Sequence, residues 1–302
     1  DLNLQQYEEV LKKHNAVLIG QTAEIAPADK LIYALRDVTA TVESIPFITA
    51  SIMSKKLAEG IDALVLDVKT GSGAFMRKIE DSVALAESLM NTAKSFGKKV
   101  IAMITDMNQP LGNYIGNWLE VYESILCLQG ENVEDLMEVT LALSGAMIML
   151  GCKATSLDEG IEISKEMIKS GKAFDKFVDI AKEQFGDVSY IINPEKYPKP
   201  KFSEKVYAIT DGYIKSMDNY EIGMASLELG AGRMKKEDII DPKAGIIFYP
   251  KIGTKISKGD LIAELFTDKE DKIEPVKNRI LNALEFSTNP VEKVKLIHKI
   301  ME

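Results

Sequence analysis

The sequence predicts an α/β fold, with a mixed-sheet α/β domain, a partial α-helical domain and a carboxy-terminal α+β domain. The first observation is a continuous apolar run at 62–68, which has the length of a strand covered on both faces. The second is a helical pattern over 79–96, closed by Gly97 and followed by an apolar strand at 99–105, which gives a β-α-β order. The third is the proline- and lysine-rich stretch 193–200, which cannot continue a helix and predicts a domain boundary.

The remaining elements follow from local patterns on either side of that boundary. Pro46 suits the first turn of a helix, because its missing N–H would have no partner there. On the amino-terminal side we expect helices over 29–36, 46–60, 118–128, 132–150, 156–170 and 173–185. On the carboxy-terminal side we expect a hairpin of 205–210 and 213–215 around Asp211-Gly212, a helix over 219–229, and strands near 245–249 and 260–266.

These elements divide the chain into three expected domains. Residues 1–29 and 61–200 are assigned to the α/β domain, 30–60 to the α-helical part and 201–302 to the carboxy-terminal domain. The length of 302 residues, with 46% apolar and 27% charged residues, is enough to bury more than one core.

Composition and charge argue against several classes of partner. The net charge of −9 disfavours a nucleic-acid polymer, which requires a surplus of Lys and Arg. The apolar runs at 63–66 and 146–150 fall far short of the roughly 20 residues that cross a bilayer, and the polar first residues do not resemble a secretory signal. We therefore expect a cytoplasmic protein without a membrane span. Cys127 and Cys152 have no metal-ligand spacing, so we expect two buried thiols and no disulfide.

One predicted helix combines alkyl, hydroxyl and amine groups on a single face. The residues that share this face by their i, i+3, i+4 and i+7 spacing are Ile48, Ser51, Ile52 and Lys55. On the preceding helix, Tyr33 and Arg36 also share a face, so a cleft between the two helices would suit a flat polar heterocycle. Spacing alone leaves a second interpretation open, in which the two isoleucines are core residues and the two cations are solvated.

Four stretches carry a resemblance to a known family. The segment 33–46, continued by 48–56, resembles the signature of the thymidine and pyrimidine-nucleoside phosphorylases, and its length makes it highly specific. The segments 67–76, 109–112 and 229–233 resemble the same family. The similarity runs from about Gln21 to the end of the chain.

The resemblance implies roles for seven residues. Family members hold the pyrimidine with the arginine, serine and lysine of the first motif, which correspond to Arg36, Ser51 and Lys55. Fixed cations facing a base that departs with its electrons stabilise the transition state more than the ground state, so Arg36 and Lys55 are the expected catalytic groups. The positions that enclose the base in the family correspond to Tyr33, Ile48, Ile52 and Phe75, although core packing alone would account for each apolar residue equally well.

The implied activity is that of a pentosyltransferase of nucleoside salvage. It would convert uridine, thymidine or deoxyuridine and phosphate into the free base and (deoxy)ribose 1-phosphate, without an organic cofactor and as a homodimer. The family's phosphate loop lies upstream of the region that matches this chain, which begins at Asp1 in mid-pattern, so we expect an incomplete phosphate side and an inactive isolated fragment. The turn at Gly71–Gly73 offers a weaker phosphate-loop interpretation, because its glycines let backbone amides approach an anion.

A structural cation, K⁺ or Ca²⁺, is a further implication of the resemblance. Family members bind it through positions that correspond to the main-chain carbonyls of Leu111 and Tyr114 and the carboxylate of Glu123. Oxygen ligands suit such a hard ion. An ordinary surface carboxylate is the alternative interpretation of Glu123. His14 and His298 lie far apart in the sequence and are assigned no catalytic role.

Three other functions compete with this interpretation. The segment 251–263 resembles half of a biotinyl or lipoyl carrier domain, but the turn at Asp211-Gly212 displays no lysine for attachment. The nearest rival is another phosphorylase or phosphoribosyltransferase of the same superfamily. The trio Arg36, Ser51 and Lys55 favours a pyrimidine enzyme over this rival. A non-catalytic structural homologue is the third.

Overall fold

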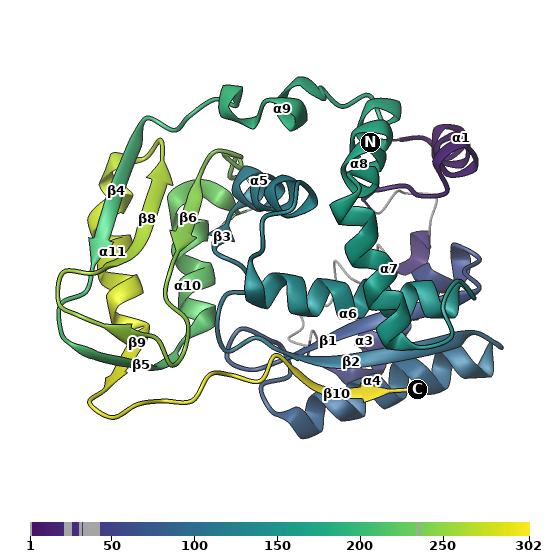
Figure 1. Ribbon diagram of the computed structural model, residues 1–302, viewed down its shortest axis with the longest axis horizontal. Helices are drawn as coiled ribbons and strands as arrows, with labels where there is room; N and C mark the ends of the chain where they lie inside the picture. Colours follow the sequence, from purple (N-terminus) through teal and green to yellow (C-terminus); the bar gives the residue numbers. More distant parts are fainter. Residues whose placement is uncertain (1, 21–25, 30–31, 33–42, 234, 236) are drawn as a thin grey trace.

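The centre of the amino-terminal part is a three-stranded sheet of order β1-β2-β10 (Figure 1). The computed structural model describes residues 2–20, 26–29, 32, 43–233, 235 and 237–302. Strands β1 (Ala63–Thr70) and β2 (Lys99–Asp106) are parallel, with Asp67 opposite Met103 and Lys69 opposite Thr105. Helix α4 (Ile79–Ser95) connects them, so the predicted β-α-β order is confirmed.

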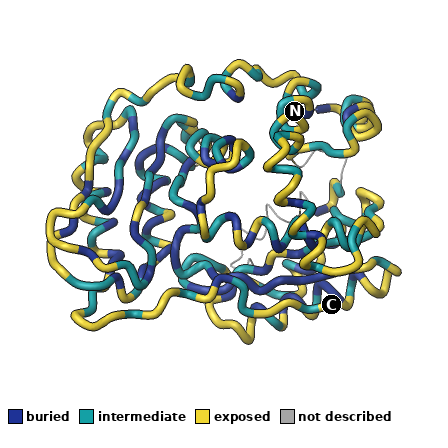
Figure 2. The backbone as a smooth tube through the Cα atoms, in the orientation of Figure 1, coloured by how far each residue is buried: buried dark blue, intermediate teal, exposed yellow. Residues whose placement is uncertain are grey.

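Strand β2 is buried on both faces, as its apolar run predicts. Its even-numbered side chains, such as Ala102 and Ile104, join a core with α4, while Ile101 and Met103 join a second core with helix α6 (Glu134–Leu150). Figure 1 shows α4 and α6 on opposite sides of the sheet, and Figure 2 shows the buried strands between them. A strand covered by helices on both faces needs apolar residues at every position, because successive side chains point to opposite faces.

The other helices of this part pack around α4 and α6. Helix α3 (Ile45–Ala58) lies against α4, where the hydroxyls of Thr49 and Ser88 are 2.8 Å apart. The outer layer consists of α1 (Leu4–His14), α5 (Asn117–Leu128), α7 (Leu157–Lys169) and α8 (Lys172–Glu183). The observed ends of these helices agree with the predicted ends to within about two residues, except for α1, which was not predicted. The helix expected over 29–36 lies mostly outside the described residues. None of the described helices has the combination of length and apolar character that a membrane span requires.

Two small sheets share one core in the carboxy-terminal part. One has the order β3 (Tyr114–Ile115), β6 (Gly245–Phe248), β8 (Leu261–Thr267) and β4 (Phe202–Tyr207). The other has the order β7 (Lys255–Ile256), β5 (Gly212–Met217) and β9 (Leu284–Ser287). Helices α10 (Asn219–Ser226) and α11 (Ile273–Asn282) add Ile222 and Val276 to the core. A π-helical turn, Leu227–Ala231, continues α10.

The hairpin expected around Asp211-Gly212 is wrong. Strand β4 pairs with β8, and β5 pairs with β7 and β9, so the two strands belong to different sheets. The reason is that both strands bury a side chain in the same core, Val206 at 1% and Ile214 at 0% exposure. The turn therefore carries the chain from one sheet to the other.

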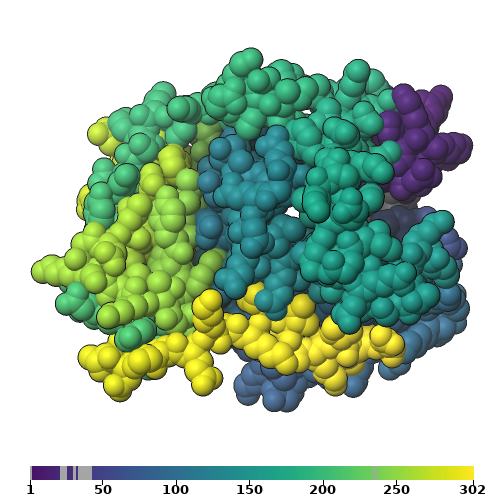
Figure 3. Space-filling view, in the orientation of Figure 1, coloured from purple at the N-terminus to yellow at the C-terminus, as the bar shows by residue number. Residues whose placement is uncertain are grey.

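Two strands cross the boundary expected at residue 200. Strand β3 precedes the boundary but pairs with β6, and strand β10 (Ile297–Met301) follows it but pairs antiparallel with β2. Figure 3 shows the last segment of the chain running along both parts of the molecule. The division into 1–29 with 61–200, 30–60 and 201–302 stays a prediction. The two parts are nevertheless joined by shared sheets as well as by the segment 193–200, where Tyr197 stacks on Trp118 with a ring separation of 3.8 Å.

The cysteines differ in their surroundings. Cys127 is buried in α5, as expected, and burial raises the pKa of its thiol. The expectation of a buried thiol at Cys152 is wrong, because α6 ends at Leu150 and Cys152 lies exposed in the following turn with φ of 57°.

Candidate active site

A cavity of about 720 Å³ lies between α3, the carboxyl end of β1, the loop 71–77 and the start of α10. Its volume is within the range of about 300–1,000 Å³ that is usual for small-molecule sites. Five of the residues proposed from the sequence line it together, namely Ile48, Ser51, Ile52, Lys55 and Phe75. Tyr33 and Arg36 lie outside the described residues.

The polar wall of the cavity is formed by Ser51 and Lys55, one helical turn apart on α3. The Lys55 Nζ donates to Ser51 Oγ at 2.9 Å and to Asp29 Oδ2 at 2.6 Å. An ammonium group has three N–H donors. Within the described part of the chain two of them are engaged, which leaves one for a bound molecule. Lys55 is therefore held in place by a buried carboxylate, Asp29 being 8% exposed.

The apolar wall shows that core packing and cavity lining are compatible roles. Ile48 and Ile52 pack against the core beneath α3 and α4 and also line the cavity. Phe75, by contrast, is 65% exposed at the edge of the cavity, which is unusual for a large apolar side chain. The interpretation that left Lys55 simply solvated does not hold, because its ammonium is paired with Asp29.

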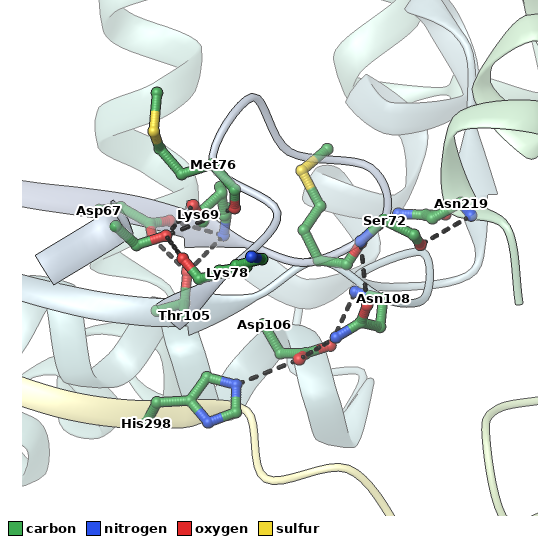
Figure 4. A network of polar contacts seen from close by, with 12 residues as sticks. Asp67, Lys69, Ser72, Met76, Lys78, Thr105, Asp106, Asn108, Asn219 and His298 are labelled. Carbon is green, nitrogen blue, oxygen red and sulfur yellow. Dashed lines mark hydrogen bonds and ion pairs between the residues drawn. The ribbon is translucent and has the colours of Figure 1, made fainter. Parts of the chain in front are cut away.

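The loop after β1 uses its amides within the protein. The N–H groups of Gly71, Ser72, Gly73 and Ala74 donate to Met76 O, Asn108 Oδ1, Met107 O and Gly71 O, respectively (Figure 4 shows the bond of Ser72). A phosphate loop requires such amides to point at the anion. Their engagement speaks against the phosphate-loop interpretation of this turn.

A chain of polar contacts holds this loop from below (Figure 4). Asp106 accepts hydrogen bonds from the N–H and the Nδ2 of Asn108, both at 2.8 Å, and its Oδ2 lies 3.1 Å from His298 Nε2. Asn108 in turn accepts the N–H of Ser72 at 2.9 Å. His298 is thus linked through Asp106 and Asn108 to Ser72, which lines the cavity. None of these contacts gives His298 a catalytic role.

Several residues that line the same cavity were not predicted for the base, although Lys69 belongs to the alternative in which it would bind phosphate together with Gly71–Gly73. Asp67 and Lys69 project from one face of β1, where Lys69 Nζ lies 2.7 Å from Asp67 Oδ2 and 3.0 Å from Thr105 Oγ1 on β2 (Figure 4). The signal was two charged residues spaced by two at the carboxyl end of an otherwise apolar strand, the end at which α/β sheets bind ligands. Tyr220, from α10, gave no local signal at all.

The candidate cation site is built around a buried glutamate. Glu123 is 3% exposed, and its carboxylate accepts the N–H of Asn113 at 2.7 Å and of Tyr114 at 3.5 Å. The surface-carboxylate alternative is therefore wrong. Burial raises the pKa of Glu123, and the backbone hydrogen bonds oppose this shift. Gly112, at φ of 71°, lies so close that a Cβ would stand 2.3 Å from Glu123 Oε2, so only glycine fits there.

A lysine from the carboxy-terminal part supplies positive charge beside this glutamate. Lys251 Nζ donates to Pro110 O at 2.6 Å, to Gly112 O, and to Asp135 Oδ2 at 2.8 Å. Among the described residues, no group of three His, Cys, Asp or Glu side chains is arranged to hold a metal ion.

Comparison with known proteins identifies the family. Residues 1–174 match the model of the "Glycosyl transferase family, a/b domain", and residues 213–287 match the "Pyrimidine nucleoside phosphorylase C-terminal domain". A pyrimidine-nucleoside phosphorylase of Staphylococcus epidermidis is 43% identical over 301 residues, covering 100% of this chain and 69% of that protein. One from Staphylococcus aureus is 42% identical over 295 residues, covering 98% and 68%. The chain belongs to the pyrimidine-nucleoside phosphorylase family, as the four sequence motifs predict.

Proposed function

We propose that this chain serves the phosphorolysis of pyrimidine nucleosides, in which uridine, thymidine or deoxyuridine reacts with phosphate to give the free base and (deoxy)ribose 1-phosphate. The observation that carries the proposal is the α3 wall of the cavity, where Lys55 and Ser51 stand beside Ile48 and Ile52. A cation, a hydroxyl and two alkyl groups on one wall match a flat heterocycle with a polar edge. No organic cofactor is needed for this reaction.

Ser51 is suited to orient the pyrimidine. Its Oγ accepts from Lys55, so its own O–H remains able to donate to a carbonyl on the edge of the base. This use differs from nucleophilic attack, for which phosphate itself is the nucleophile. Phe75 and the two isoleucines would enclose the faces of the ring.

Lys55 is suited to stabilise the departing base. When the glycosidic bond breaks, the base takes the electron pair, and negative charge develops on its ring nitrogen and oxygen atoms. A fixed ammonium facing those atoms stabilises the transition state more than the ground state. Asp29 and Ser51 hold that ammonium in position, which lowers the reorganisation needed during the reaction. Arg36 is proposed for the same role by its place in the sequence motif.

The second substrate, the cation and the assembly are further parts of the proposal. Phosphate is expected outside the amides of 71–74, which are engaged within the protein. The oxygen donors at Leu111, Tyr114 and Glu123 fit a hard cation such as K⁺ or Ca²⁺ chemically, with Lys251 nearby as competing positive charge. A homodimer in the cytoplasm is the expected setting.

The test is phosphate-dependent release of uracil from uridine by the intact protein, with adenosine as the rival substrate. Lys55→Met and Arg36→Ala should each lower kcat by about 10²–10³, with smaller effects on KM. Lys56→Met is the matched control on the same helix, since Lys56 pairs with Glu59 at the surface. Near-normal kcat in Lys55→Met would refute the leaving-group role, and release of adenine instead of uracil would favour a purine enzyme of the superfamily.

A further inference from the structure

The start of helix α10 is docked on the loop that lines the cavity. Asn219 N donates to Ser72 Oγ at 3.0 Å, and Ser72 Oγ donates to Met217 O at 3.1 Å (Figure 4). Asn219 Nδ2 donates to Met107 O at 3.2 Å, the same carbonyl that accepts the N–H of Gly73 at 3.0 Å. The carboxy-terminal part of the chain is therefore fixed directly to the wall of the cavity.

Shape confirms how closely the two surfaces meet. A Cβ on Gly73 would stand 2.8 Å from Asn219 Nδ2, which is closer than an ordinary contact. The loop can approach α10 this closely because glycine has no Cβ. Asn219 itself is 9% exposed. Because its side chain and backbone are both held, the next residue along the helix has a defined position.

That next residue, Tyr220, lines the cavity. Tyr220 is 52% exposed, and its hydroxyl has no hydrogen-bond partner among the residues that the structure describes. A half-exposed tyrosine at a cavity wall offers a rigid ring face and a hydroxyl that both donates and accepts.

We infer that Tyr220 contacts the sugar of the bound nucleoside, an inference that rests on the proposed function. The polar edge of the base is assigned to Ser51 and Lys55 on α3, whereas Tyr220 comes from α10 beside Ser72 and Met107 at another wall of the cavity. The sugar must extend away from the base and so toward other walls. A neutral aromatic ring and hydroxyl suit the C–H face and hydroxyls of a pentose better than the charge of phosphate.

Tyr220→Ala in the intact protein should raise the KM for uridine about tenfold and leave kcat nearly unchanged, because contact with sugar atoms remote from the breaking bond at C1′ contributes equally to ground and transition states. Tyr220→Phe should recover part of this loss. The inhibition constant of free uracil and the KM for phosphate should stay at their wild-type values. Tyr207→Ala is the matched control, since Tyr207 is also about half exposed (49%) in the carboxy-terminal part but does not line the cavity.

Two kinetic results and one binding result would overturn the inference. An unchanged KM for uridine in Tyr220→Ala would show that the ring does not touch substrate, and a tenfold weaker inhibition by uracil would place it at the base. Calorimetric binding of uridine separates this inference from the proposed function. A wild-type protein that binds uridine but releases no uracil would refute phosphorolysis, whereas equal uridine binding by wild type and Tyr220→Ala would refute the role of Tyr220.

Discussion

Lys251 joins the two parts of the molecule, and we expect its substitution to destabilise the fold. Its ammonium donates to two main-chain carbonyls, Pro110 O and Gly112 O, and to the carboxylate of Asp135. All three N–H donors are thus used. Burial lowers the pKa of Lys251, while the charges of Asp135 and Glu123 oppose this shift. The substitution Lys251→Met keeps most of the aliphatic length and removes only the charge and the donors.

The expected loss of free energy of unfolding follows from the carboxylate of Asp135, which stays buried without its partner. Asp135, 12% exposed, would keep the N–H of Gly112 at 3.3 Å and of Leu136 at 2.8 Å but would lose its counter-charge. Removing one partner of a buried ion pair typically costs about 3–5 kcal/mol. Because the side chain of Lys251 is 23% exposed, we expect the lower end of this range, about 3 kcal/mol.

Urea unfolding followed by tryptophan fluorescence would measure this loss. Trp118 is the single tryptophan and lies next to the junction, where its main-chain N–H donates to Pro242 O at 3.0 Å. Lys293→Met is the matched control, because Lys293 and Glu134 are both more than 80% exposed and 3.7 Å apart, a pair worth about 0–1 kcal/mol. Adding Asp135→Asn to Lys251→Met should recover part of the loss. If Lys251→Met unfolded at the same urea concentration as the control, the junction would not depend on this lysine.

Three further predictions concern single residues. Gly73→Ala should lower stability and uridine affinity together, because its Cβ would stand 2.8 Å from Asn219 Nδ2; wild-type values for both would show that the two surfaces separate easily. At pH 8 a thiol reagent should alkylate exposed Cys152 quickly and Cys127 slowly, because burial raises the pKa of Cys127 and so lowers its thiolate fraction; mass spectrometry of timed samples measures the two rates, and faster labelling of Cys127 would contradict this reasoning. Ser51→Ala should keep measurable phosphorolysis and form no covalent intermediate, and trapping a sugar on Ser51 would contradict its role in orientation.

The sequence by itself determined most of the helices and strands and the helix face proposed to bind the base. The strands at 63–70 and 99–106 were predicted within about two residues from their apolar runs, which are a local property. Burial on both faces holds for β2, whereas β1 exposes Asp67 near its carboxyl end. The face of Ser51 and Lys55 was likewise predicted from the 3.6-residue period of one helix, and the structure brings the two side chains to 2.9 Å. Each of these inferences depends on residues fewer than about ten positions apart.

Tertiary structure alone decided which distant groups meet. The pairing of β4 with β8 rather than β5 depended on both strands facing one core, and the return of β10 to β2 joined residues nearly 200 positions apart. The burial of Glu123, its neighbour Lys251 and the place of Tyr220 at the cavity were also invisible in the sequence. A surface helix and a buried one can share a local pattern, because burial of a polar side chain is set by whichever segment packs over it. Here the loop at Gly112 and Tyr114 packs on Glu123, and Lys251 from the carboxy-terminal part in turn holds that loop.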